Sequence, residues 1–161
     1  MIHLTQKFSV RKLQQIIGYK FKSPKILLQA RTRRQYYQGK KSKEEKNTME
    51  PLATLGDAVL DLIVINNLYQ KNERDEGRLS QEKEKDVKKT RTFMLATNLH
   101  YEKFVRWGKG EQKDEIWKSG MDTFDTCIES LVGGIFLDAQ KRNLNGISEV
   151  EKVLKHLSLI S

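Results

Sequence analysis

Two long apolar segments constrain the fold of this chain more than any other feature of the sequence. Within residues 51–70, apolar side chains recur at helical spacing and cover more than one face, which is typical of a helix buried at the centre of a bundle. Residues 122–140 repeat the pattern. No stretch of five or more residues alternates apolar and polar side chains like a half-buried strand. The sequence therefore predicts an all-α fold.

Shorter helical patterns flank these two segments. Ser23-Pro24 predicts the cap and first turn of one helix, and Gly18 the end of the helix before it. A polar loop is expected at residues 39–48. No internal repeat or long linker divides the chain, so we expect one domain over residues 1–161 with about seven helices. The helix that ends at Gly18 carries Phe8, Leu13, Ile16 and Ile17, and the one that Ser23-Pro24 opens carries Ile26, Leu27 and Ala30. The remaining helices are expected at 79–89, 92–105 and about 148–158.

The number of cysteines and the hydropathy of the chain indicate the cellular compartment of the protein. Cys127 is the only cysteine, so an internal disulfide is excluded, and the composition suits a reducing cytoplasm. The N-terminal residues contain no apolar run of signal-peptide length. We expect no later stretch to span a membrane either. The expectation is a cytoplasmic protein.

Charge is unevenly distributed along the chain. Residues 1–49 hold thirteen Lys and Arg and two acidic residues, a formal charge of +11, whereas residues 50–161 hold seventeen and nineteen, a formal charge of −2. A basic region attracts polyphosphate backbones by releasing counterions. A solvated basic surface without a ligand explains the charge equally well.

Carboxylates interrupt both apolar segments. Asp57 lies in the first, with Glu50 two helical turns before it and Asp61 one turn after it. The second has Asp122, Asp125 and Glu129 at i, i+3 and i+7, which places them in one stripe. A buried carboxylate is costly unless a basic side chain, a proton or a metal ion neutralises it.

Because acidic residues occur in both segments, a metal ion explains them as well as isolated salt bridges do. Two core helices that each carry a carboxylate stripe can face one another and form a site of oxygen ligands, which hard cations such as Mg²⁺ prefer. Such cations assist phosphodiester hydrolysis. The small residues Ser130, Gly133 and Gly134 in the second segment would permit close helix packing.

Five ordered segments between about residues 10 and 140 resemble the ribonuclease III family. LATLGDAVLDLIV resembles its signature LEFLGDAVL, and IESLVGGIFLDA resembles its second motif, EALIGAIYLD. DEGRLSQ (75–81) is similar to D-E-G-E-L-S, GKGEQ (108–112) to G-K-G-E-E, and residues 13–34 to the opening helices. The resemblance implies the helical endonuclease-domain fold of that family.

The family uses four carboxylates, two from each motif, and this chain matches two of them. Asp57 and Glu129 are present, whereas Ala53 and Thr126 stand at the other two positions. Glu50 corresponds to a flanking acid, and Asp125 lies one turn before Glu129. The resemblance thus implies Asp57 and Glu129 as catalytic residues. The implied metal ligands are Asp57, Glu129, Asp125 and Glu50.

The resemblance implies hydrolysis of phosphodiesters in double-stranded or structured RNA, with RNA processing as the role and 5′-phosphate and 3′-hydroxyl ends as the products. Mg²⁺ is the implied cofactor, and Mn²⁺ could substitute. The Ala and Thr pattern is similar to that of the ribonuclease Mini-III branch, which lacks a double-stranded-RNA-binding domain, and we expect none in this chain.

Partners follow from the same resemblance. Family members are twofold symmetric homodimers, and the apolar residues Phe124, Ile128 and Leu131 are either a dimer patch or ordinary core. Duplex RNA is bound mainly through phosphates and 2′-hydroxyls. The candidate RNA-binding residues are Arg31, Arg33, Arg34, Lys40, Lys41, Lys88, Lys89, Lys109 and Lys113.

Two other functions compete with an active nuclease. Ala53 and Thr126 also suit a catalytically inactive member that binds structured RNA or a ribonucleoprotein. A basic all-α protein-interaction domain agrees with the composition alone. The nuclease hypothesis requires that Asp57 and Glu129 meet in space, with no lysine or arginine filling the gap between them.

Overall fold

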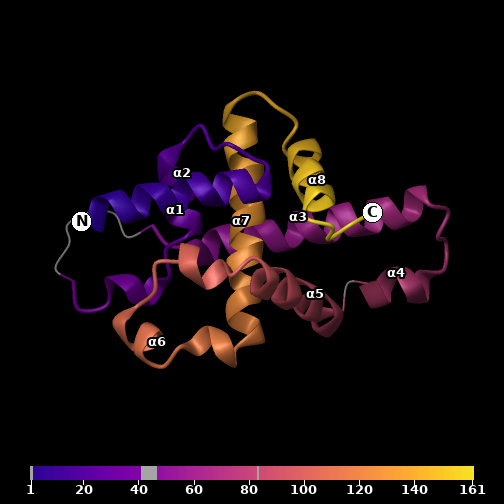
Figure 1. Cartoon of the computed structure of the whole chain (residues 1–161). Helices are drawn as coiled ribbons and strands as arrows, with labels where there is room; N and C mark the ends of the chain where they lie inside the picture. The colour runs from indigo at the N-terminus through magenta and orange to yellow at the C-terminus, as the bar shows by residue number, and fades with distance from the viewer. Residues whose placement is uncertain (1, 41–46, 83) are drawn as a thin grey trace.

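The computed structural model describes residues 2–40, 47–82 and 84–161, and this part of the chain is built from helices (Figure 1). The α-helices are α1 (Ile2–Ile17), α2 (Pro24–Ala30), α3 (Met49–Gln70), α4 (Glu76–Glu82), α5 (Lys85–Asn98), α6 (Lys109–Lys113), α7 (Met121–Lys141) and α8 (Gly146–His156). Three short 3-10 helices connect them: η1 (Arg34–Tyr37), η2 (Tyr101–Phe104) and η3 (Ile116–Lys118). Within the described ranges, the nearest approach to a sheet is one isolated bridge between Thr32 and Arg106. The all-α prediction is confirmed.

The centre of the fold is the crossing of α3 and α7 (Figure 1). The two backbones touch at Gly56 and Gly133. A Cβ atom on Gly56 would lie 1.7 Å from the carbonyl oxygen of Glu129, and one on Gly133 would lie 2.1 Å from that of Leu52. Close packing through Gly133 was expected from the sequence, and the role of Gly56 was not. The crossing fixes which residues of the two helices can meet.

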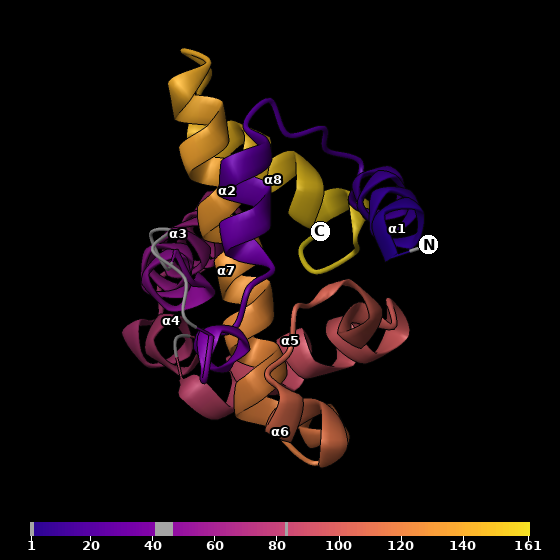
Figure 2. The ribbon, with the colours of Figure 1, turned by 90° about the vertical axis from the view of Figure 1, so that its left-hand side faces the viewer.

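The first turn of α2 and the segment before it are tied to α7. Ser23 accepts a hydrogen bond from the backbone of Ile26 and caps α2, and Pro24 stands in its first turn, as predicted. Asp138, which is 1% exposed, accepts hydrogen bonds from the Tyr19 hydroxyl at 2.9 Å and from the backbone of Ser23 at 2.8 Å. Figure 2 shows α2 lying along α7, where these bonds hold it.

Two helix boundaries differ from the prediction. The polar helix expected at 79–89 ends at Glu82. The last residues of that expected helix belong instead to α5, which continues into the helix expected at 92–105. That second helix stops at Asn98, because His100 adopts a left-handed backbone with φ 49°. Lys88 and Lys89 therefore belong to the same helix as Phe93 and Leu95, which face the core. The shift brings both lysines against α7.

Two further expectations need correction. Phe124, Ile128 and Leu131 are 3%, 1% and 2% exposed, so they form core and cannot be a dimer patch. By length and hydropathy alone, α3 could cross a membrane. From the sequence, no segment is expected to be long and apolar enough to do so. Core helices of soluble proteins pass the same test.

Candidate active site

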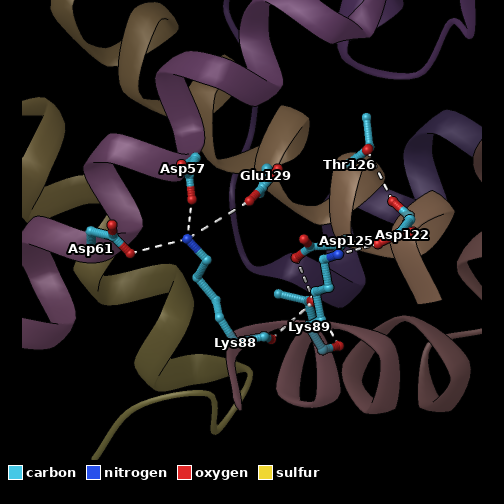
Figure 3. A network of polar contacts seen from close by, with 9 residues as sticks. Asp57, Asp61, Lys88, Lys89, Asp122, Asp125, Thr126 and Glu129 are labelled. Carbon is cyan, nitrogen blue, oxygen red and sulfur yellow. Dashed lines mark hydrogen bonds and ion pairs between the residues drawn. The ribbon is translucent and has the colours of Figure 1, made fainter. Parts of the chain in front are cut away.

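The crossing of α3 and α7 brings acidic side chains from both helices to one open pocket of about 480 Å³ (Figure 3). Asp57 follows Gly56 on α3, and Glu129 is the residue whose carbonyl Gly56 touches. The two predicted catalytic carboxylates therefore come together. The residues that line the pocket are Glu50, Ala53, Thr54, Asp57, Asp61, Lys88, Lys89, Asp122, Asp125, Thr126 and Glu129.

Lys88 on α5 stands between these carboxylates (Figure 3). Its ammonium group forms a short ion pair with Asp57, lies 3.1 Å from Asp61 Oδ1 and is 4.0 Å from Glu129 Oε1. Burial acts to lower the pKa of Lys88, but the hydrogen bonds to Asp57 and Asp61 outweigh it and raise the pKa. The condition that no basic residue fills this gap is not met, because α5 packs against α7 and carries Lys88 into it. The nuclease hypothesis therefore now requires that Lys88 can be displaced from the gap.

Asp122 and Asp125 each contact a residue of α5. Lys89 forms an ion pair with Asp122. Asp125 is 6% exposed and accepts a hydrogen bond of 2.8 Å from the Thr92 hydroxyl, and its pKa is raised by burial in spite of that bond. The Thr126 hydroxyl donates to the Asp122 carbonyl and offers no charge to the pocket.

Glu129 is the most strongly perturbed carboxyl of the site. Its side chain is 13% exposed. Burial, followed by the charges of Asp125 and Asp57, raises the pKa of Glu129 to about 8, and Lys88 opposes these effects only partly. Without a further cation, Glu129 therefore holds a proton at neutral pH.

This protonation predicts an unusual dependence of stability on pH. The folded-state pKa of Glu129 lies above its unfolded value, so the folded protein binds an extra proton between about pH 4.5 and pH 8 and loses stability as pH rises through that window. In EDTA, Glu129→Gln is expected to raise the free energy of unfolding relative to the native sequence by about 2 kcal/mol more at pH 8 than at pH 5.5. Urea unfolding at the two pH values measures the difference.

Glu151→Gln is the control for that measurement. Glu151 lies on α8 in an ion pair with Lys155, away from the pocket. The same change there is expected to leave the pH dependence of unfolding as it is in the native sequence. Parallel pH profiles for Glu129→Gln and the native sequence would contradict the perturbed pKa.

Glu50 belongs to the wall of the same pocket. One of its carboxylate oxygens accepts a hydrogen bond from the backbone of Arg34 at 3.2 Å. The other, Oε2, is buried and has no hydrogen-bond partner among the described residues. An unsatisfied buried carboxylate oxygen is costly unless a cation or water reaches it. Glu50 thus adds negative charge to a site that already has an excess of it.

The donor set fits a hard divalent cation, provided that Lys88 moves. Six carboxyl groups and two ammonium groups line the pocket, so negative charge remains after both lysines are paired. Oxygen ligands of this kind suit Mg²⁺ and Mn²⁺. As the side chains stand, however, no three acidic, histidine or cysteine side chains of the described ranges are arranged to hold a metal ion. The ammonium group of Lys88 takes the central position instead.

The candidate RNA-binding residues fall into two groups. The prediction is wrong for Arg31, which is 6% exposed and donates to the Phe104 carbonyl at 2.6 Å. It is also wrong for Arg33, whose guanidinium is paired with Glu111 at 2.8 Å and joins η1 to α6. Lys88 and Lys89 face the carboxylates, and Lys41 lies outside the described residues. The exposed candidates are Arg34, Lys40, Lys109 and Lys113.

Arg106 is a basic residue near these candidates that the sequence did not single out. Its guanidinium lies 3.9 Å from the ring centre of Tyr36 on η1, and Lys40 lies over the same ring at 3.3 Å. No motif marks Arg106, and Lys88 is equally indistinct beside Lys85 and Lys89. Only the packing of α5 and η1 reveals their positions.

Comparisons with known proteins agree with this architecture. A family model described as Ribonuclease-III-like matches residues 23–156. The chain is 34% identical over 139 residues to Ribonuclease 3 of Proteus mirabilis, covering 86% of this chain and 58% of the relative. It is 32% identical over 147 residues to Ribonuclease 3 of Listeria monocytogenes, covering 91% and 61%. The chain therefore spans about three fifths of these curated relatives.

Solved structures give the same assignment. The nuclease domain of Ribonuclease III from Campylobacter jejuni matches with a TM-score of 0.75 and 28% identity, covering 92% of this chain and 94% of that one. A second structure of that domain matches with a TM-score of 0.74. The family resemblance of the sequence motifs is thus confirmed by both kinds of comparison. The chain belongs to the ribonuclease-III-like family and has the all-helical fold of a ribonuclease III nuclease domain.

Proposed function

We propose that this protein is a ribonuclease III-type endoribonuclease that hydrolyses phosphodiesters in double-stranded or structured RNA with a divalent cation. One observation carries the proposal: Asp57 on α3 and Glu129 on α7 converge on one open acidic pocket. Family membership supports the reaction class. The pocket supports the cation, because its carboxyl groups outnumber its ammonium groups.

Asp57 and Glu129 are the proposed principal ligands of Mg²⁺, for which Mn²⁺ could substitute. When bound, such a cation lowers the pKa of an attacking water and stabilises the charge on the leaving oxygen. Asp125 and Glu50 line the same pocket and add negative charge that favours a cation. Glu129 would hold the cation as a carboxylate, and its proton would pass to solvent. The Thr92 hydroxyl orients Asp125 at the back of the site.

Exposed basic side chains on and near η1 and α6 are the proposed contacts to the RNA backbone. Arg34 lies on η1 and Lys40 shortly after it, and Lys109 and Lys113 lie on α6, which packs against η1. Arg33 and Glu111 fix the two elements to each other. Phosphate contacts of this kind bind a duplex without reading its base sequence.

Homodimer formation through α3 is part of the proposal. Leu55, Ala58, Leu62, Ile65 and Tyr69 recur at alternating spacings of three and four residues, roughly opposite Gly56 on the helix. Leu62 is 55% exposed and Tyr69 is 49% exposed. The similar Campylobacter jejuni nuclease domain is described as having a region involved in dimer formation. A twofold dimer would present one pocket to each strand of a duplex.

Leu62→Glu is expected to shift the protein from dimer to monomer, because it places a charge in the apolar stripe on α3. Sedimentation velocity at a series of protein concentrations measures the change. Leu28→Glu is the matched control, since Leu28 is 44% exposed but lies on α2. The stripe is not the interface if both variants sediment like the native sequence.

A second function is favoured by specific residues of the same pocket. Ala53 and Thr126 provide no carboxylate, and Lys88 supplies a permanent positive charge between Asp57 and Glu129. These features suit a member of the family that binds structured RNA without cutting it. The exposed basic residues on η1 and α6 would serve such a binder equally well.

Cleavage and binding assays separate the two functions. A long RNA duplex and its separate strands are incubated with the protein in MgCl₂, in MnCl₂ and in EDTA. The nuclease proposal expects cutting of the duplex in either metal, with 5′-phosphate ends, and none in EDTA. Retarded migration of the duplex without cutting in any metal would support the binder. Absence of both cutting and retardation would overturn both functions.

A further inference from the structure

Lys88 reaches the carboxylates of two helices from a third helix. Its ammonium group contacts Asp57 and Asp61 of α3 and lies 4.0 Å from Glu129 of α7. The side chain is 10% exposed, so these carboxylates take the place of water around the charge. Figure 3 shows the chain of Lys88 extended from α5 to the centre of the acidic group.

The same turn of α5 is anchored to α7 by a second contact. Thr92 is completely buried, and its hydroxyl lies 3.1 Å from the Lys88 carbonyl and donates to Asp125 at 2.8 Å. This contact fixes the backbone from which Lys88 extends. The ammonium group is therefore held at the pocket by the fold as well as by its own charge.

We propose that Lys88 is a tethered cation that occupies the position between Asp57 of α3 and Glu129 of α7 until a divalent cation displaces it. Two positive groups cannot share the same oxygens of Asp57 without strong repulsion, so the occupants exclude each other. The displaced ammonium group can withdraw because the lysine stem is flexible. The inference rests on the proposed function, since it takes this pocket as the cation site.

Lys89 provides a matched comparison for Lys88. It is the next residue on α5, carries the same charge and lines the same pocket. Its ammonium group, however, pairs with Asp122, whose side chain is 81% exposed at the edge of the site. Removal of either charge changes the net charge equally. A difference in Mn²⁺ affinity between the Lys88 and Lys89 variants is therefore due to the position of the lost ammonium group in the pocket.

Binding of Mn²⁺ measured by electron paramagnetic resonance tests the displacement without an activity assay. Lys88→Met is expected to bind Mn²⁺ about tenfold more tightly than the native sequence, because no ammonium group competes. Lys89→Met is expected to stay within about threefold of the native sequence. In EDTA, Lys88→Met is expected to melt at a lower temperature than the native sequence and to recover when MgCl₂ is added.

Lys88→Arg covers the case in which the methionine variant does not fold. It keeps the charge, so its Mn²⁺ affinity is expected to equal or fall below that of the native sequence. Tighter binding by Lys88→Arg would overturn the inference, as would equal gains in Lys88→Met and Lys89→Met.

The outcomes distinguish this inference from the proposed function. Equal Mn²⁺ affinities for Lys88→Met and the native sequence would overturn the displacement and leave the metal-dependent nuclease standing. Failure of every folded variant to bind Mn²⁺ would overturn the metal-dependent function, and the displacement with it.

Discussion

Gly56→Ala is expected to lower the free energy of unfolding by about 3 kcal/mol or more. The new Cβ would lie 1.7 Å from the carbonyl oxygen of Glu129 and 2.8 Å from the backbone nitrogen of Gly133. Backbone atoms of a helix cannot rotate away as the end of a side chain can. The helices α3 and α7 must therefore separate, which opens the core on both sides of the crossing. Urea unfolding followed by circular dichroism measures the loss.

Gly110→Ala is the control for this substitution. Gly110 lies in α6, and a Cβ there would meet no atom within 4 Å. Alanine also favours the helix over glycine, so a gain of up to about 1 kcal/mol is expected. A Gly56→Ala variant as stable as Gly110→Ala would show that the two long helices do not touch at this point.

The same clash connects stability with the site. Asp57 is the neighbour of Gly56, and Glu129 provides the carbonyl that Gly56 touches. Any separation of α3 from α7 moves these two carboxylates apart. A glycine beside the aspartate is thus required for the packing that assembles the pocket, which gives a physical reason for the glycine and aspartate of the signature motif to occur together.

The sequence predicted what depends on patterns within one helix. Apolar residues that recur at helical spacing located α3 and α7, and Ser23-Pro24 located the start of α2. The acidic stripes together with the two family motifs also predicted that Asp57 and Glu129 would meet, and both line one pocket. These patterns lie within single segments of the sequence, so they can be recognised without knowledge of the tertiary fold.

The sequence could not predict which basic side chains pair with acidic residues of distant segments. Arg33 pairs with Glu111 across 78 residues, and Lys88 pairs with Asp57 across 31. Arg31, Arg33 and Lys88 look like surface charges in the sequence, because nothing near them indicates a partner. The break that separates α4 from α5 was missed for a related reason. Both sides of the break are polar, so apolar periodicity could not locate it.

Asp57→Asn is expected to reduce the rate of duplex cleavage in MgCl₂ by about 10³-fold. The amide cannot neutralise a divalent cation, and loss of a ligand worth about 4 kcal/mol in the transition state corresponds to that factor. The Asp57 side chain is 46% exposed, so the free energy of unfolding is expected to change by about 1 kcal/mol or less. Single-turnover cleavage with excess protein measures the rate, and circular dichroism verifies the fold.

Asp122→Asn separates a role as a ligand from a general effect of charge. Asp122 lines the same pocket but is 81% exposed and paired with Lys89, so its loss is expected to slow cleavage by about tenfold or less. Equal losses in the two variants would mean that the pocket acts through its overall negative charge alone. An Asp57→Asn protein that cuts at the native rate would place the reaction elsewhere on the chain. A large loss in Asp57→Asn but not in Asp122→Asn is expected, because Asp57 adjoins the α3–α7 contact and pairs with Lys88 at the centre of the site, whereas Asp122 pairs with Lys89 at its edge.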